Sequence, residues 1–157
     1  MSPRLSLFLA LFCALGLDQF SKVFVFKSLN LENLYTINVF PPVLNFRLGW
    51  NEGINFGLFA NAPEVVRWGL ILFAIAVSIG VVLWAWPKRD QVSAISAGLL
   101  AGGAMGNAID RGIFGAVRDF LNMSCCGINN PYVFNIADVA VFAGVFGLIY
   151  VLEIRKS

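Results

Sequence analysis

The stretch WGLILFAIAVSIGVVLWAW, residues Trp68–Trp86, contains no charged residue. A helix needs about 17 to 25 predominantly apolar residues to cross a lipid bilayer, and this stretch satisfies that length. Three further stretches are comparably long and apolar: Leu5–Phe26, Val92–Ile109 and Val133–Leu152. The pattern predicts an all-α membrane protein with four transmembrane helices.

The composition of the whole chain agrees with this fold class. The chain has 157 residues, of which 59% are hydrophobic and 13% charged, and its mean hydropathy is +0.78. A soluble domain is about one quarter charged. The length suits one domain, so we expect residues 1–157 to form a single integral membrane domain.

The first apolar stretch has an alternative interpretation as a cleaved signal peptide. Arg4 precedes it, and LFCALG loosely matches a lipoprotein cleavage site. However, Phe12 stands before Cys13 where a small residue is required, and the apolar pattern continues into LDQFSKVFVF. We therefore expect this stretch to remain as a transmembrane helix.

The distribution of Lys and Arg predicts the orientation of the helices. Arg4, the pair Lys88 and Arg89, and the pair Arg155 and Lys156 mark three segments as cytoplasmic. Both termini are then cytoplasmic, and the segments 27–67 and 110–132 face outward, although they also contain some Arg. No basic patch indicates nucleic-acid binding.

The chain has no histidine, which excludes several kinds of catalytic site. Ser-His-Asp triads, Cys-His pairs and HExxH zinc sites all require imidazole. We expect neither a metal nor a cofactor. Three cysteines are too few for a disulfide scaffold, and the adjacent Cys125 and Cys126 are either free thiols or an oxidised pair.

The outward segment after the first helix carries a strand pattern. In Leu44–Trp50, apolar Leu44, Phe46, Leu48 and Trp50 alternate with polar residues or glycine, which is typical of a strand with one apolar face. A lone strand is unstable. We expect a small sheet at the membrane surface, with its apolar face toward lipid or the helices, and residues 52–59 leading back to the second helix.

Two ionisable residues interrupt the first helix. Asp18 and Lys22 are four residues apart on one helical face, where they can form an ion pair with a structural role. A Ser-Lys catalytic dyad that uses Lys22 is an alternative. No serine fits as its nucleophile, since Ser21 is adjacent and points elsewhere on a helix.

A second polar group lies at the outer end of the third helix, in GGAMGNAIDRG. Asn107, Asp110 and Arg111 can share a face there, and the glycines before them permit close helix contact. The residues alone leave two interpretations open. The group is either a polar latch between helices or a ligand-binding site.

The third polar group consists of two aspartates that flank the connection between the last two helices. Asp119 follows the third helix and Asp138 opens the fourth, so antiparallel packing brings them to the same membrane face. Asn135 fits the N-cap of the fourth helix, with Asp138 at the N3 position. Two carboxylates in a low-dielectric pocket share a proton, as in aspartic proteases, but paired carboxylates also serve as proton relays in transporters.

Five motifs carry a resemblance to a known family. LDQFSK, NEGINFG, GGAMGNAIDR, GAVRDF and FNIAD occur in this order across the four apolar stretches. In this combination the chain closely resembles the bacterial lipoprotein signal peptidases, the type II signal peptidases. The resemblance extends from Asp18 to the last helix. The insert LNMSCCGINNPYV between the last two motifs departs from the family pattern, and its double cysteine has no role that the resemblance implies.

The resemblance implies an inner-membrane aspartic endopeptidase with a small periplasmic sheet and a short periplasmic helix. Its substrate would be a prolipoprotein, cut before a cysteine that already carries diacylglycerol, and we expect the enzyme to act as a monomer within membrane lipid. The catalytic aspartates of the family correspond to Asp119 and Asp138. The motifs assign substrate positioning to the remaining polar residues: Asn51, Gly53, Asn107, Asp110, Arg111 and Asn135.

The expected mechanism has Asp138 as the initial base, because it lies near a helix start, and Asp119 as the protonated partner. Arg111 is expected to pair with Asp110 or to bind substrate carbonyls. Two other functions remain to be distinguished. A proton-coupled transporter would use Asp18 or Asp138 near the bilayer centre, whereas a lipoprotein-binding scaffold would bind without cleaving.

Overall fold

The computed structural model describes residues 1–53, 63–88, 90–124 and 130–154. Within them, four helices are long and apolar enough to cross a membrane. These are α1 Pro3–Val23, which continues as the π-helix Phe24–Ser28, α3 Pro63–Ala85, α4 Gln91–Phe114 and α5 Ile136–Ile154. The predicted fold class is confirmed, and the first apolar stretch is part of the bundle.

The helices differ from the apolar stretches at their ends. Helix α3 begins at Pro63 rather than at Trp68, so Glu64 and Arg67 are helical even though they are charged. Helix α4 continues past Ile109 to Phe114 and ends at Gly115, whose φ of 83° suits glycine. Polar residues at these ends lower the hydropathy without breaking the helix. The length of an apolar stretch therefore does not predict the helix ends accurately.

Helix α4 is the central helix, and α1, α3 and α5 pack against it. Within its most apolar window 61% of the residues are buried, against 22% in each of the other three helices. Glycines on α4 permit this packing, because a Cβ on Gly98 or Gly102 would overlap the backbone carbonyl oxygen of Leu7 or Leu11 on α1. The other helices expose large apolar side chains on their outer surfaces, as expected for contact with lipid.

A three-stranded antiparallel sheet adjoins one end of the bundle. Its strands are β1 Thr36–Phe40, β2 Leu44–Asn51 and β3 Val117–Met123, in the order β1-β2-β3. The strand predicted at Leu44–Trp50 is therefore confirmed. Its side chains Phe46 and Leu48 pack on a buried cluster that includes Phe26 and Phe120, which places part of its apolar face against the helices. The one-turn helix α2 Leu31–Leu34 precedes β1.

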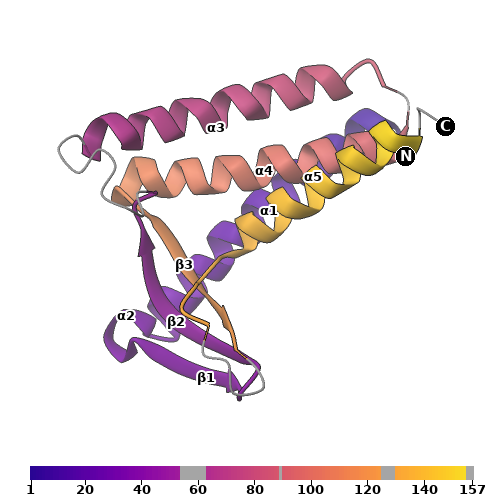
Figure 1. Ribbon diagram of the computed structural model, residues 1–157. Coiled ribbons are helices and arrows are strands. Elements are labelled where there is room, and N and C mark those ends of the chain that lie inside the picture. The colour runs from indigo at the N-terminus through magenta and orange to yellow at the C-terminus, as the bar shows by residue number, and fades with distance from the viewer. Residues whose placement is uncertain (54–62, 89, 125–129, 155–157) are drawn as a thin grey trace.

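The arrangement separates two ends of the molecule (Figure 1). The sheet lies at the end where α4 finishes and α5 begins, whereas the start of α1 and the end of α5 lie together at the opposite end. At that opposite end, Arg4 stacks over Trp86 and Lys88 over Trp84, which are contacts suited to a membrane interface. Arg89, Arg155 and Lys156, used above for orientation, lie outside the described residues, as do residues 54–59 and the pair Cys125 and Cys126.

Candidate active site

The site lies where the sheet meets the helix bundle, and its first element is the start of α5. The backbone N–H of Asp138 donates to Asn135 Oδ1 at 2.9 Å, and the backbone N–H of Asn135 donates to Asp138 Oδ2 at 3.2 Å. This reciprocal pair is a capping box with Asn135 at the N-cap and Asp138 at N3. The predicted cap is confirmed, and it fixes the position of the Asp138 carboxylate at the helix end.

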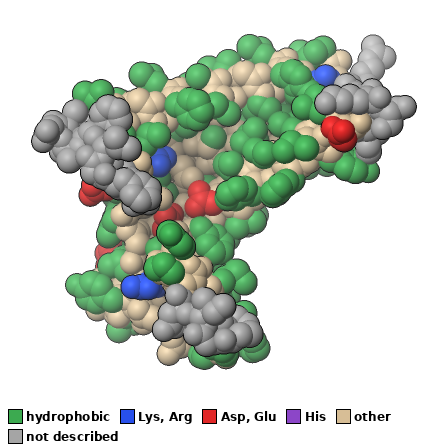
Figure 2. All heavy atoms as spheres, in the orientation of Figure 1, with side chains coloured by type: hydrophobic (Ala, Val, Ile, Leu, Met, Phe, Trp, Pro, Cys, Tyr) green, Lys and Arg blue, Asp and Glu red, His purple; other side chains and the backbone are tan. Residues whose placement is uncertain are grey.

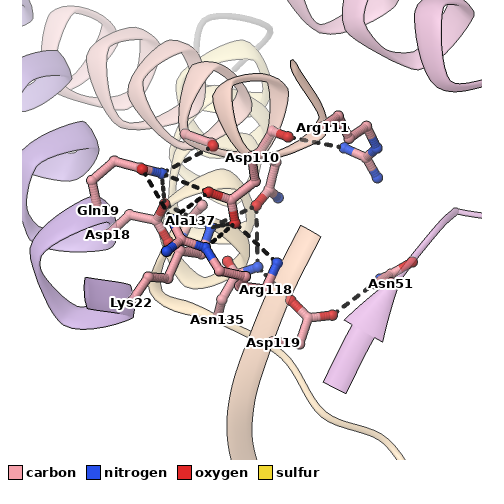
Figure 3. A network of polar contacts seen from close by, with 12 residues as sticks. Asp18, Gln19, Lys22, Asn51, Asp110, Arg111, Arg118, Asp119, Asn135 and Ala137 are labelled. Atoms are coloured by element: carbon pink, nitrogen blue, oxygen red, sulfur yellow. Dashed lines mark hydrogen bonds and ion pairs between the residues drawn. The ribbon is translucent and has the colours of Figure 1, made fainter. Parts of the chain in front are cut away.

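The second carboxylate comes from the sheet. Asp119 lies on β3 with 2% of its surface exposed. Its Oδ1 accepts a hydrogen bond from Asn135 Nδ2 at 2.5 Å, and its Oδ2 accepts one from Asn51 Nδ2 on β2 at 3.1 Å. The backbone N–H of Gly53 donates to Asn51 Oδ1 at 2.9 Å and so orients the Asn51 amide with its NH₂ toward Asp119 (Figure 3).

The environment of Asp119 favours its protonated form. Burial, and secondarily the negative charge of Asp138, raise the pKa of Asp119 from its ordinary value of 3.8 to about 6. The hydrogen bonds from Asn51 and Asn135 act in the opposite direction without cancelling this shift. The structure thus brings the two aspartates of the sequence prediction close enough for their charges to interact.

Asn107 connects the two sides of the site from the middle helix. Its Nδ2 donates to Asp138 Oδ1 at 2.8 Å, and its Oδ1 accepts from Asn135 Nδ2 at 3.1 Å. Both oxygens of Asp138 therefore accept hydrogen bonds, one from Asn107 and one from the backbone of Asn135.

Arg111 does not form the ion pair with Asp110 that was one of the two expectations. Adjacent residues on a helix point in different directions, and Asp110 pairs instead with Lys22 and Arg118. Arg111 Nη1 donates only weakly to its own helix, to Asn107 O at 3.5 Å, and its buried Nε has no hydrogen-bond partner among the described residues. The guanidinium is thus available near the carboxylates.

Arg67 is a further residue of the site that the sequence analysis missed. Its Nε donates to the carbonyl oxygen of Arg111 at 2.7 Å, and its Nη2 donates to that of Gly112 at 2.9 Å. Arg67 thereby satisfies carbonyls at the end of α4 and ties α3 to it. The sequence signal that could have indicated this role is the position of Arg67 directly before the apolar stretch that begins at Trp68.

A buried charged cluster lies behind the carboxylates. Lys22 Nζ lies 2.7 Å from Asp18 Oδ2 and 3.1 Å from Asp110 Oδ2, and Arg118 Nη2 lies 2.9 Å from Asp110 Oδ1. The Asp18–Lys22 pair is therefore present as predicted, with both side chains fully buried. Arg118 directly precedes Asp119 in GAVRDF, and the motif alone does not indicate its pairing with Asp110.

Gln19 is the second unassigned member of this cluster. Its Nε2 donates to both carboxylates, at 3.0 Å to Asp18 and 3.2 Å to Asp110, and its Oε1 accepts from Arg118 at 3.3 Å. A neutral amide thus spans the same two acids that Lys22 joins. Its place in LDQFSK, beside Asp18 in an apolar helix, was the only indication of such a role.

An apolar cavity of about 450 Å³ opens beside Asp138. Its other lining residues are apolar: Phe134, Val139, Phe142 and Ala143. Val139 and Phe142 are also exposed on the outer surface of α5, with 48% and 62% of their surfaces accessible. Figure 2 shows acidic side chains in the hollow where the helices meet the sheet, with hydrophobic side chains along α5 beside them.

In the part of the chain that the structure describes, no group of three or more His, Cys, Asp or Glu side chains is arranged to hold a metal ion. The described site consists of two carboxylates, amide donors and one available guanidinium next to an apolar cavity. Such a set can share a proton and bind polar backbone groups of a chain that lies in lipid.

The fold and site together define a helical membrane protein with a paired-carboxylate site at the end of its bundle. Comparison with known proteins identifies the family. Residues 10–154 match the family model for Signal peptidase (SPase) II, so the chain belongs to the signal peptidase II family and is a peptidase.

Proteins from several bacteria are similar to this chain. It is 39% identical over 141 residues to a lipoprotein signal peptidase of Methylorubrum extorquens (strain PA1), which covers 90% of this chain and 81% of the relative. It is also 39% identical over 155 residues to a lipoprotein signal peptidase of Nitrobacter hamburgensis (strain DSM 10229 / NCIMB 13809 / X14), covering 96% and 93% of the two chains.

Solved structures share the fold. A bacterial membrane enzyme determined at 2.3 Å resolution is 26% identical and aligns with a TM-score of 0.78, covering 95% of this chain and 88% of the other. A second bacterial membrane enzyme, determined at 1.9 Å, is 25% identical with a TM-score of 0.74, covering 92% and 90%.

Proposed function

We propose that this protein is an aspartic endopeptidase that removes the signal peptide from diacylglyceryl-modified prolipoproteins, with Asp119 and Asp138 as its catalytic pair. The bond cut lies on the N-terminal side of the lipidated cysteine. The name of the similar proteins, lipoprotein signal peptidase, supports this substrate class. In this proposal residues 1–157 act as a single unit and the enzyme works as a monomer.

The observation that carries the proposal is the position of Asn135 between the two acids. Its side chain donates to Asp119 and accepts from the backbone N–H of Asp138. One residue therefore fixes carboxylates that come from a strand and a helix. A pair held in this way is pre-organised to activate water without a metal or a covalent nucleophile.

The chemistry begins with Asp119 protonated and Asp138 ionised. Asp138 takes a proton from a water molecule as the water oxygen attacks the scissile carbonyl carbon, and Asp119 gives its proton to the carbonyl oxygen. The resulting tetrahedral intermediate collapses when Asp138 passes its proton to the amide nitrogen and the C–N bond breaks. Asp119 regains a proton from a hydroxyl of the intermediate, which restores the starting state.

The substrate enters from lipid along α5. The apolar cavity beside Asp138 accommodates hydrophobic substrate groups, and the exposed Val139 and Phe142 continue it toward the bilayer. Asn51, which contacts Asp119, binds backbone groups of the substrate together with Gly53 and Arg111. Arg111 is suited to this role because its described hydrogen bonding within the chain is weak.

The enzyme resides in the bacterial inner membrane with both termini cytoplasmic and the catalytic pair at the periplasmic face. This orientation requires basic residues at the cytoplasmic end of the bundle. Arg4 and Lys88 lie at the end opposite the sheet, each stacked on a tryptophan, in agreement with the positive-inside rule.

The position of the carboxylates disfavours a proton-coupled transporter. Asp138 lies in the first turn of α5, at the end of its candidate span, and Asp18 contacts the backbone N–H of the neighbouring Ala137. Asp119 lies on β3, outside the candidate spans. A transporter requires its carboxylate near the middle of the bilayer.

The experiment that tests the proposal is mass spectrometry of a synthetic diacylated prolipoprotein after incubation with purified protein. The wild type should release the signal peptide with a new N-terminus at the lipidated cysteine. Asp119→Asn and Asp138→Asn should each fold and leave the precursor intact. Near-normal cleavage by both variants would refute the aspartic mechanism, and binding of the precursor by the wild type without cleavage would favour a scaffold.

A further inference from the structure

The ammonium group of Lys22 lies at the centre of three oxygen contacts. Its Nζ lies 2.7 Å from Asp18 Oδ2, 3.1 Å from Asp110 Oδ2 and 3.3 Å from Asn107 Oδ1. Lys22 donates hydrogen bonds to Asp18 and Asn107 and forms an ion pair with Asp110. Lys22 is fully buried and does not line the apolar cavity.

The first contact leads to Asp138. Asp18 Oδ1 accepts a hydrogen bond of 2.9 Å from the backbone N–H of Ala137, the residue directly before Asp138. A carboxylate of α1 therefore caps the first turn of α5, where the helix dipole favours negative charge. Gly106 makes room for this contact, because a Cβ there would meet Asp18 Oδ2 at 2.7 Å.

The second contact leads to Asp119 in the same way. Asp110 Oδ2 accepts a hydrogen bond of 2.9 Å from the backbone N–H of Arg118, the residue directly before Asp119. The oxygen that receives the backbone of β3 is thus the same one that contacts Lys22.

The third contact orients the Asn107 amide. Because Asn107 Oδ1 accepts from Lys22, its NH₂ points the other way and donates to Asp138 Oδ1 at 2.8 Å. Each of the three residues that Lys22 contacts therefore also makes a hydrogen bond to Asp138 itself or to the residue directly before Asp138 or Asp119.

We propose that Lys22 is a positioning residue that sets the separation of the catalytic carboxylates. It holds Asp18 and Asp110 together, and these two acids hold the backbones that carry Asp138 and Asp119. This inference rests on the proposed function, since it assigns Lys22 a role in the same reaction. It differs from a structural ion pair within α1, which would stabilise the helix without fixing any distance at the site.

The charges of the cluster make the two roles separable. Asp18 and Asp110 face Lys22 and Arg118, so the four groups are neutral together. Lys22→Met alone leaves an excess buried negative charge and destabilises the fold. The double variant Asp18→Asn with Lys22→Met restores neutrality. The amide that replaces the carboxylate retains an oxygen to accept from Ala137, yet no charged group joins it to Asp110.

The experiment compares this double variant with the wild type in detergent or lipid, by thermal unfolding and by cleavage of a diacylated prolipoprotein. A matched control is Lys27→Met, which removes an exposed lysine from the π-helix that continues α1. The control should keep wild-type kcat and KM. The double variant should fold, with kcat lowered at least tenfold and KM changed less than twofold, because the apolar cavity is untouched.

The pH profile supplies a readout that stability alone would not change. Asp138 raises the pKa of Asp119 and Lys22 lowers it. Loss of the Lys22 charge alone should therefore shift the alkaline midpoint of kcat/KM to higher pH, whereas separation of the carboxylates should shift it to lower pH, and a net shift to lower pH is the result that the proposal expects. A folded double variant with kcat within twofold of wild type and an unchanged midpoint would overturn the proposal. Loss of folding in the double variant would also overturn it, since Lys22 would then be a requirement of the fold.

These outcomes are distinct from failure of the proposed function. If the wild type does not cleave, or if Asp119→Asn and Asp138→Asn cleave normally, the peptidase mechanism is wrong whatever Lys22 does. If the wild type cleaves and the double variant cleaves just as fast, the mechanism stands and the role of Lys22 is wrong.

Discussion

Asn135 and Asp138 cap each other at the start of α5, each donating its backbone N–H to the side chain of the other. The Nδ2 atom of the same Asn135 side chain carries two N–H donors, and one of them reaches Asp119. The Asn135 side chain therefore both caps α5 and links the two acids. Substitutions of Asn135 should therefore affect the stability of the protein and its cleavage rate to different extents.

Substitution of Asn135 should separate these two roles. Asn135→Ser keeps a good N-cap but loses the donor to Asp119, whereas Asn135→Ala loses both. We expect both variants to cleave at least tenfold more slowly, and Asn135→Ala to be less stable than Asn135→Ser by about 1 kcal/mol. Thermal unfolding and initial cleavage rates measure the two effects. Equal stability of both variants together with wild-type rates would contradict the dual role.

The raised pKa of Asp119 predicts a pH dependence of cleavage. Its pKa is about 6, and the mechanism requires its protonated form. The value of kcat/KM should therefore be lost as the pH rises through about 6, approaching a tenfold fall for each further step of one in pH. Initial rates between about pH 5 and 8.5 test this, with circular dichroism to check folding at each pH. A flat profile over this range would mean that Asp119 does not supply the proton.

The same raised pKa predicts that Asp119→Asn stabilises the protein at neutral pH. Because the folded pKa of about 6 lies above the ordinary value of 3.8, the fold favours the protonated carboxyl, and its stability decreases as the pH rises from about 4 through 6. Full ionisation of Asp119 in the fold costs about 3 kcal/mol, since a tenfold change in an acid dissociation constant corresponds to about 1.4 kcal/mol.

Asparagine does not ionise, so the advantage of Asp119→Asn over the wild type should grow between about pH 5 and 7.5. Part of it is offset by weaker hydrogen bonding to Asn51 and Asn135, and about 1 to 2 kcal/mol should remain. Thermal unfolding at several pH values provides the measurement. An equal difference at the two ends of this pH range would show that Asp119 is not preferentially protonated in the fold.

Close packing of α4 on α1 predicts a contrast between two glycines. A Cβ on Gly102 would overlap the carbonyl oxygen of Leu11, whereas a Cβ on Gly80 of α3 meets nothing within 4 Å. Gly102→Ala should lower stability by about 1 to 3 kcal/mol. Gly80→Ala should be neutral or slightly stabilising, because alanine favours the helix. Unfolding temperatures of the two variants measure this difference. An unchanged unfolding temperature for Gly102→Ala would mean that α1 and α4 can move apart without loss of stability.

Several local features of this protein could be predicted from the sequence. The four helices follow from the length of apolar stretches, the strand at Leu44–Trp50 from its alternation, and the cap at Asn135 from its spacing to Asp138. The paired residues Asp18 and Lys22 are four residues apart on one helix. All of these depend on residues that are near one another along the chain, where backbone geometry alone fixes the contact.

The tertiary structure alone decided which distant groups meet. That Lys22 contacts Asp110, that Asp18 caps α5 and that Arg67 covers the end of α4 each depend on how separate helices pack. The choice between the two expectations for Arg111 has the same origin, because its neighbour Asp110 pairs with charges from α1 and β3. Spacing along the sequence does not predict these pairings. They result from competition among all the polar groups that packing excludes from water.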